Sequence, residues 1–192
     1  MTAPLAPGFA DPVLDAQRCF RAVLEGMARP GRIHCVPIMP EHPAPLGAAA
    51  AAVLLTLADA DTPVWLDGGA AAEAWLRFHA GCRVADIPAE AAFLLACRTP
   101  PDLRNLALGT DEEPHRSATL IIQVAGLQEG AGWRLTGPGI EREHRLLVEG
   151  LPVRFVDDWE ANRARFPRGV DVILCAGDRL AALPRTTTLE IA

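Results

Sequence analysis

The hydrophobic pattern is densest near the middle of the chain. Residues 118–125 read Ala-Thr-Leu-Ile-Ile-Gln-Val-Ala, which leaves little room for a polar face. A strand that is apolar on both sides is normally covered on both sides, so this run predicts a central strand of a sheet. Three glycines follow, and they predict that residues 133–136 return beside this strand as the second arm of a hairpin. The next segment, Gly137-Pro138-Gly139, cannot be regular strand. It predicts a tight turn or, alternatively, a backbone surface for a ligand or partner.

The first half of the chain alternates between helical and extended patterns. Asp11-Pro12 is a helix-start signal, and the helix is expected to end at Arg29-Pro30-Gly31. Its apolar stripe is expected to consist of Val13, Ala16, Phe20, Val23, Leu24 and Met27. A short strand is predicted at 32–36, a buried, apolar helix at 46–58, a strand at 64–66 and a helix at 70–80 that ends at Gly81.

The second half of the chain is richer in strands and hairpins. Strands are predicted at 84–87, 91–97 and 170–175, and short helices at 102–109 and 157–165. Residues 141–148 fit a strand or a helix, and we favour the strand. Gly177-Asp178 predicts a hairpin with 179–183, and 189–191 fit an edge strand. This mixture predicts an α/β fold, a three-layer α/β/α sandwich with a mixed sheet. We expect a flexible N-terminus over 1–10 and one domain over 11–192.

Composition excludes several kinds of chemistry. The net charge of −6 argues against a nucleic-acid or anionic-membrane binder. All 18 basic residues are Arg, so neither the Schiff-base lysine of pyridoxal-phosphate (PLP) enzymes nor a P-loop lysine is possible. The five scattered cysteines contain no Cys-x-x-Cys pair, which favours buried free thiols in a reducing cytosol. No secretory signal is evident and the longest apolar run, 46–58, is too short to cross a bilayer, so we expect a soluble cytoplasmic protein.

Familiar catalytic motifs are absent. None of the five histidines forms a metal-binding motif. His79 is expected to support a helix C-terminus, and His144 is expected on a solvated face, although a catalytic base is an alternative. Ser117, the single serine, has no nucleophile elbow around it. Cys175 ends an apolar strand and is expected in the core.

One polar cluster stands out near the end of the chain. Arg179 and Arg185 are followed by a run of three threonines, Thr186 to Thr188. A guanidinium beside hydroxyls suits a phosphate or phosphonate oxygen, because it binds bidentately. The alternative is that Arg185 pairs with a nearby carboxylate and that the threonines reflect strand propensity.

Several segments together resemble a known family. They occur in family order as Phe20-Arg-Ala-Val-Leu24, Leu55-Thr-Leu-Ala-Asp59, Asp61-Thr-Pro-Val-Trp-Leu66, Leu76-Arg-Phe-His79, Ala118-Thr-Leu-Ile121, Arg134-Leu-Thr-Gly137, Phe166-Pro167, Gly169-Val-Asp171 and Leu183-Pro-Arg-Thr-Thr187. The chain resembles the PhnH family, the H subunit of the bacterial carbon–phosphorus lyase core complex. The resemblance implies the fold of the large domain of PLP-dependent transferases without PLP. It also implies a homodimer that joins three other kinds of subunit and an ATP-binding-cassette-like partner.

The resemblance further implies the reaction in which the chain takes part. The complex transfers a phosphonate to the ribose of ATP, displaces adenine and forms a ribose 1-phosphonate 5-triphosphate. A radical subunit with an iron–sulfur cluster later breaks the C–P bond, and this chain lacks the cysteine pattern for that cluster. We therefore expect no cofactor here.

Three hypotheses for the role of the chain follow. The first is a dimeric subunit that is needed for the transferase step but is not catalytic alone. The second is a subunit that contributes ligand-binding groups, for which the candidates are Thr136, Arg185, Thr186 and Thr187. The third, and weakest, is an unrelated stand-alone enzyme that uses Cys or His.

Overall fold

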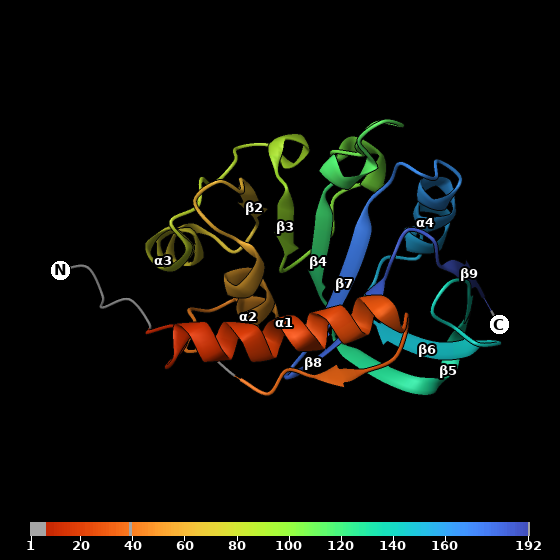
Figure 1. Cartoon of the computed structure of the whole chain (residues 1–192), viewed down its shortest axis with the longest axis horizontal. Coiled ribbons are helices and arrows are strands. Elements are labelled where there is room, and N and C mark those ends of the chain that lie inside the picture. The colour runs from red at the N-terminus through yellow and green to blue at the C-terminus, as the bar shows by residue number, and fades with distance from the viewer. Residues whose placement is uncertain (1–6, 39, 192) are drawn as a thin grey trace.

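A six-stranded sheet forms the centre of the molecule (Figure 1). The structure is a computed structural model, and it describes residues 7–38 and 40–191. The order of the sheet is β1-β8-β7-β4-β3-β2. Its strands are β1 (His34–Cys35), β2 (Val64–Leu66), β3 (Phe93–Ala96), β4 (Thr119–Gln123), β7 (Asp171–Ala176) and β8 (Arg179–Leu183). Strands β2, β3, β4 and β7 run parallel, β8 runs antiparallel to them, and β1 pairs antiparallel with β8, so the predicted mixed sheet is confirmed.

Strand β4 lies between β3 and β7, as its two-sided apolar pattern predicted. Ile121 pairs with Leu95 on one side and with Ile173 on the other, and all three side chains are buried. These three side chains point to one face of the sheet, and their neighbours Leu120 and Val172 point to the other. Both faces of the sheet are therefore buried.

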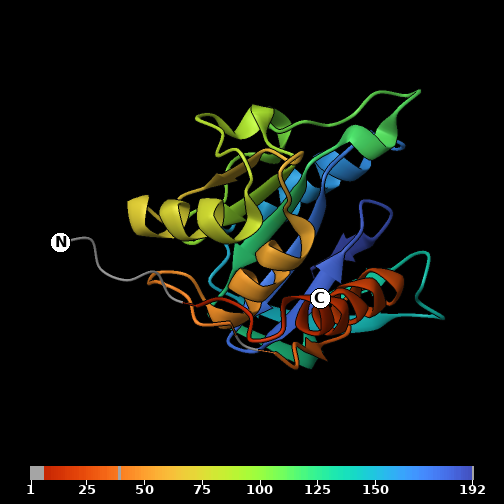
Figure 2. The same ribbon diagram turned by 60° about the vertical axis from the view of Figure 1, so that its left-hand side comes forward.

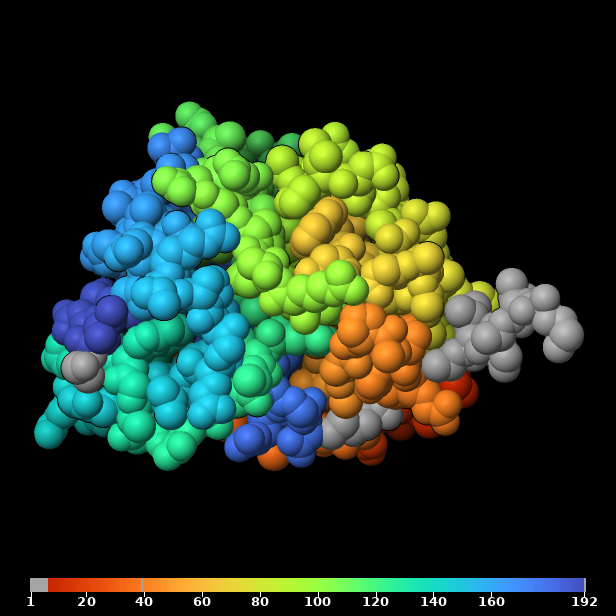
Figure 3. Space-filling model, turned by 180° about the vertical axis from the view of Figure 1, so that it is seen from behind, coloured from red at the N-terminus to blue at the C-terminus, as the bar shows by residue number. Residues whose placement is uncertain are grey.

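Three helices cover the first face. They are α1 (Pro12–Ala28), α2 (Ala48–Leu57) and α3 (Ala70–Ala80). Residues 49–54 of α2 are buried, which confirms a helix that is apolar nearly all round. Gly81 ends α3 with a φ of 67°, as predicted. In Figure 3, which shows the molecule from the opposite side, α1 is almost hidden.

The other face is covered by a second sheet and by α4 (Phe155–Arg163). This sheet has the order β6-β5-β9, formed by β6 (His144–Glu149), β5 (Gly126–Thr136) and β9 (Thr188–Glu190). The expected α/β/α layering is thus present, with α4 sharing its layer with a small antiparallel sheet. The strands predicted at 141–148 and near 189 are both confirmed here.

The hairpin predicted for residues 118–136 is wrong. Strand β5 is continuous through the glycines, with a bulge between Glu129 and Trp133, and it pairs with β6 and β9 rather than with β4. The turn at Gly137-Pro138-Gly139 is present, closed by an N–H···O bond of 3.1 Å from Ile140 to the Gly137 carbonyl. Two further predictions fail. The helix at 102–109 is only the 3-10 turn Leu103–Asn105, and 84–87 contributes only the bridge from Val84 to Val64.

The stripe predicted for α1 is divided between two faces, because Val23 is buried in the core whereas Val13, Phe20 and Leu24 are exposed. Asp11 caps the helix, because its carboxylate accepts from the Leu14 N–H at 3.1 Å. The buried residues of α1 are Asp15, Cys19, Val23 and Gly26. The side of the helix that carries Val13, Phe20 and Leu24 faces outward, where all three side chains are exposed.

The N-terminal prediction concerns residues 1–10. Residues 1–6 lie outside the described part of the chain, and Gly8 pairs with Glu41. Among the helices of the described residues, none is long and apolar enough to cross a membrane.

Candidate functional site around Arg185

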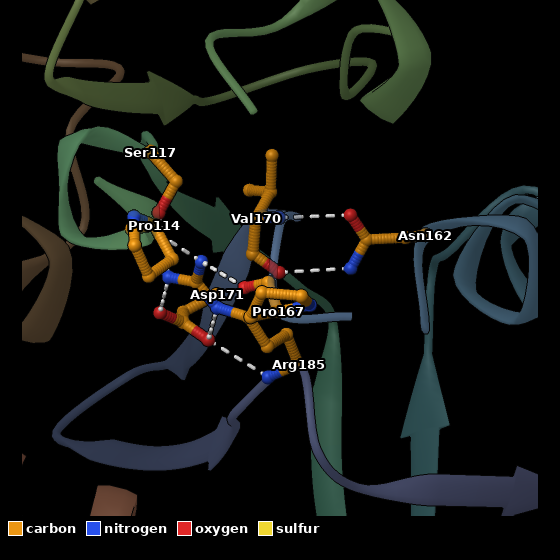
Figure 4. Close-up of polar contacts among 7 residues, drawn as sticks. All are labelled: Pro114, Ser117, Asn162, Pro167, Val170, Asp171 and Arg185. Atoms are coloured by element: carbon orange, nitrogen blue, oxygen red, sulfur yellow. Dashed lines mark hydrogen bonds and ion pairs between the residues drawn. The ribbon is translucent and has the colours of Figure 1, made fainter. Parts of the chain in front are cut away.

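Arg185 lies in the short connection between β8 and β9, directly after Pro184. Its guanidinium points back over the start of β7 towards Asp171 (Figure 4). Nε donates to Oδ1 of Asp171 at 3.1 Å and Nη2 donates to Oδ2 at 2.5 Å. The backbone N–H of Arg185 donates to the same Oδ1 at 2.7 Å. Side chain and main chain together therefore hold this carboxylate.

The remaining donors of Arg185 reach two other loops. Nη1 donates to the carbonyls of Pro114, at 2.9 Å, and Pro167, at 3.3 Å. Nη2 also donates to Oγ of Ser117 at 2.5 Å. A guanidinium has five N–H donors, and here each of them has an acceptor. Arg185 thus ties the start of β7 to the loop before β4 and to the loop after α4.

Burial makes this network a strong one. The Arg185 and Asp171 side chains are only 13% and 16% exposed. A paired, poorly solvated guanidinium cannot be released without leaving a carboxylate unpaired. A phosphonate at Arg185 would have to replace one of the five acceptors. The pairing with a carboxylate is what the alternative interpretation expected, and the anion-binding role of Arg185 stays a prediction.

The structure places the threonines beside Arg185, each in a different setting. Thr187 is fully buried; its carbonyl accepts from Nε1 of Trp159 at 3.0 Å, and its Oγ1 has no hydrogen-bond partner among the described residues. Thr136 ends β5 and pairs with Thr188 of β9. Thr186 lines an open groove. Arg179, by contrast, begins β8 at the opposite end from Arg185, so it does not belong to the cluster.

The open groove lies directly against the Arg185 network. It has a volume of about 370 Å³, and Arg185 and Asp171 form part of its wall. The rest of the wall is mainly apolar, with contributions from Met27, Pro114, Phe166, Pro167 and Pro184. Phe166 is 63% exposed. This lining suits an apolar partner surface better than a small anion.

Sequence analysis missed two residues that build this site. Asp171 holds Arg185, and Asn162 closes the preceding loop by accepting from the Val170 N–H at 2.8 Å and donating to the Val170 carbonyl at 2.9 Å (Figure 4). Asn162 is 2% exposed. The available signal was an acidic residue that opens a strand otherwise apolar on both sides, because a charge at such a position needs a partner.

Other candidate groups are not activated. Burial raises the pKa of the Cys175 thiol, and burial together with the Asp67 carboxylate raises the pKa of Cys97 to about 12. Such thiols are protonated near neutral pH and are poor nucleophiles. No group of three metal-ligating side chains occurs in residues 7–38 and 40–191. His79 lies at the end of α3 and makes edge contacts with Trp75 and Phe78.

These features define a class: an α/β domain with a mixed sheet in which a polar cluster around Arg185 joins separate loops. The sequence places the chain within that class. It belongs to the family described as "Bacterial phosphonate metabolism protein (PhnH)", which it matches over residues 7–190.

Two relatives are similar over almost the whole chain. The "Alpha-D-ribose 1-methylphosphonate 5-triphosphate synthase subunit PhnH" of Rhizobium meliloti (strain 1021) is 45% identical over 187 residues, which cover 95% of this chain and 94% of the relative. The "Putative C-P lyase subunit protein HtxG" of Stutzerimonas stutzeri is 35% identical over 177 residues, which cover 91% of this chain and 86% of the relative. The family resemblance of the sequence is therefore confirmed.

Proposed function

We propose that this chain is a subunit of a carbon–phosphorus lyase core complex. In that complex it is needed for the step that forms a ribose 1-phosphonate 5-triphosphate from ATP and a phosphonate, during the breakdown of organic phosphonates. The observation that carries the proposal is the similarity to a relative named as a subunit of that synthase. The chain is 45% identical to this relative and covers 94% of the relative's length. The proposed place of work is the cytoplasm, which supplies ATP and in which free cysteines such as these stay reduced.

We further propose that the chain is not catalytic alone and carries no cofactor. Three observations support this. The donors of Arg185 are all used within the protein, the thiols of Cys97 and Cys175 have raised pKa values, and the sequence has no lysine for PLP.

The test is a reconstitution. The purified chain, incubated with ATP and methylphosphonate, should release no adenine, and the complex assembled with the other subunits should release it. Leaving this one chain out of the mixture should abolish the release. Robust turnover by the chain alone would reject the non-catalytic role, and full turnover without it would reject the subunit role.

The outer face of α1 supports a dimer. Val13, Phe20 and Leu24 are 78%, 48% and 55% exposed and lie on one stripe of the helix. The stripe continues through Met27 into the groove beside Arg185. An apolar stripe of this length on a helix is usually covered. We propose that a second copy of the chain covers it, since a two-fold contact sets the same stripe of each copy against the other.

Sedimentation of the purified chain tests this dimer. Phe20→Ser combined with Leu24→Ser should convert the dimer to a monomer that keeps the far-UV circular dichroism of the folded chain, because neither side chain is part of the core. Phe78→Ser is the matched control, because Phe78 is 69% exposed on a different helix, α3. A chain that is monomeric before any substitution would contradict the dimer.

The alternative role is a subunit that contributes ligand-binding groups through Thr136, Arg185, Thr186 and Thr187. The observation in its favour is that Arg185 and Thr186 line the open groove. Thr186→Val in the reconstituted complex should then reduce activity while assembly survives. Normal activity in this variant would remove Thr186 from the site without touching the first proposal.

A further inference from the structure

A second, polar hollow opens where the end of α1 meets the loop before β6. Its volume is about 280 Å³. Figure 2 shows one end of α1 beside the strands β5 and β6. The charged and polar side chains in its lining are Arg29, Arg32, Arg142, His144, Glu141 and Glu143. Three guanidinium groups around one hollow are unusual in a chain whose net charge is −6.

Two glycines fix the walls of this hollow. Gly31 and Gly139 have φ values of 77° and 83°, which favour glycine. A Cβ at Gly139 would collide with the carbonyl oxygen of Ala28, and a Cβ at Gly31 would collide with the side chain of Leu135. Gly139 is therefore packed against the backbone at the end of α1 and Gly31 against a core side chain, so the arginines project from a close-fitting support.

Some of the charged side chains in the lining form ion pairs with the described residues and others do not. Arg29 is bonded to Glu25 at 2.5 Å, and Glu143 is bonded to Arg134 at 2.7 Å. Arg32 and Arg142 form no ion pair with any described residue. Nε2 of His144 has no hydrogen-bond partner in that part of the chain, but it lies 3.6 Å from Oε2 of Glu129, a further carboxylate beside the hollow. Of the carboxylates in the lining, Glu141 is the one left without an ion pair among the described residues. Among the groups without an ion pair, the lining therefore holds two guanidiniums and one carboxylate, while Glu143 and the neighbouring Glu129 are paired with Arg134 and His144.

We propose that this hollow binds a phosphorus oxyanion, either a phosphonate or the terminal phosphate of a triphosphate chain. Arg32 and Arg142 would each present a planar fork that matches two oxygens of such a group. The inference rests on the proposed function only for the presence of these ligands. The placement of the site rests on the uncommitted arginines and on the rigid loops that carry them.

Two features of the hollow oppose anions and therefore set the kind of ligand. The carbonyl end of α1 carries partial negative charge, and Glu141 carries a full one. For a singly charged anion, attraction to the guanidiniums is largely offset by repulsion from the helix end and from Glu141. A phosphonate dianion or a triphosphate is attracted more strongly to both guanidiniums. Removing the charge of Glu141 should consequently strengthen binding.

Calorimetric titration of the purified full chain tests the site, with methylphosphonate and inorganic triphosphate as separate probes at about 0.15 M salt. One of the two should bind at one site per chain, and the comparison identifies the source of the oxyanion. Arg32→Ala with Arg142→Ala should weaken binding at least ~10-fold, Arg32→Lys with Arg142→Lys should weaken it less, and Glu141→Gln should tighten it. Melting temperatures show that each variant is folded.

Arg21→Ala with Arg98→Ala is the matched control, because it removes the same charge at exposed positions outside the hollow. Equal weakening by the two double variants would overturn the proposal in favour of diffuse attraction, and no binding by the unsubstituted chain would overturn it outright.

Assembly with the partner subunits is measured on the same variants. Lost assembly with unchanged anion binding would make the arginines a contact for an acidic partner and overturn the site. If the unsubstituted chain fails to assemble at all, the proposed function fails instead, and a bound oxyanion would still stand.

Discussion

Two arginine–aspartate pairs show how the setting of a residue decides its role. Arg185 and Arg104 each contact both carboxylate oxygens of an aspartate. Arg185 is largely buried and also holds three acceptors outside its aspartate, whereas the Arg104 side chain is 55% exposed, bonds Asp102 beside its own 3-10 turn and lies 4.0 Å from Asp158 of α4. The same arginine–aspartate pairing therefore links distant loops in one case and lies at the protein surface in the other.

Arg185→Ala should destabilise the protein by about 3 kcal/mol, because it leaves the poorly solvated carboxylate of Asp171 without its partner. Urea unfolding measures the loss. Arg104→Ala is the control and should have a smaller effect, since the Arg104 side chain is 55% exposed and, within the described part of the chain, makes no hydrogen bond outside its aspartate. Equal losses for the two variants would show that burial does not distinguish these pairs.

The Asp102–Arg104 pair gives a pH signature. Hydrogen bonds from Arg104 lower the pKa of Asp102 to about 2, from an ordinary value of 3.8. The folded pKa lies below the unfolded one, so the contribution is present above pH 3.8 and is lost as pH falls towards 2. Asp102→Asn should flatten the decline of unfolding free energy over this window. An unchanged decline in acid unfolding curves would assign that loss of stability to other carboxylates.

At this scale the sequence could identify residue types but not their partners. The Arg-Thr-Thr-Thr run was found, and its last residue, Thr188, pairs with Thr136 on the adjoining strand. Asp171 lies 14 residues before Arg185, and Ser117 lies 68 residues before it, so nothing in the local pattern announces either contact. Whether all five N–H donors of a guanidinium find acceptors depends on where loops from three parts of the chain meet. That meeting point is visible only in the folded structure.

Among the elements, β5 departed most from expectation. Glycines usually punctuate a strand, and Gly130 and Gly132 both have positive φ, as a turn would require. In the structure they form a bulge, after which the strand continues beside β6. A bulge and a hairpin turn use the same residues. Pairing with β6 and β9, which lie later in the chain, decides between them.

The bulge predicts different costs for its two glycines. Gly130→Ala should destabilise by about 1–2 kcal/mol, from positive φ alone, because an added Cβ there meets nothing within 4 Å. Gly132→Ala should cost roughly 3 kcal/mol or more, because its Cβ would lie 2.5 Å from the Cα of Leu147 in β6. Chemical unfolding of both variants measures the difference. Equal losses would mean that β6 shifts to accept the extra carbon.

Helix α1 shows the limit of periodicity as evidence. The spacing of Val13, Phe20 and Leu24 correctly predicts that one face of the helix is apolar. The inward face combines Val23 with small or polar residues, among them Gly26, whose Cβ position lies 2.9 Å from the side chain of Leu180. Periodicity gives the direction of a stripe around the helix axis. It does not say whether the core or another protein covers that stripe.

At the scale of the whole molecule, the central strands explain why the fold was predictable. Strands β4 and β7 are apolar on both sides, and their alternate side chains enter the cores on the two faces of the sheet. This pattern required a layer on each face, which gave the three-layer architecture. It could not reveal that one outer layer includes a second sheet, because β5, β6 and β9 come from separate stretches of the chain.

The same strands predict that the molecule unfolds as one unit. Ile121 and Ile173 belong to the core under α1 and α2, while the adjacent Leu120 and Val172 belong to the core under α4 and β5. Neither core can be lost without exposing a side of the strands that the other needs. Tryptophan fluorescence, which senses Trp75 in one core and Trp65, Trp133 and Trp159 in the other, should therefore follow the same urea transition as far-UV circular dichroism. Two separated transitions would show that the faces fold independently, and the chain would then behave as more than one domain.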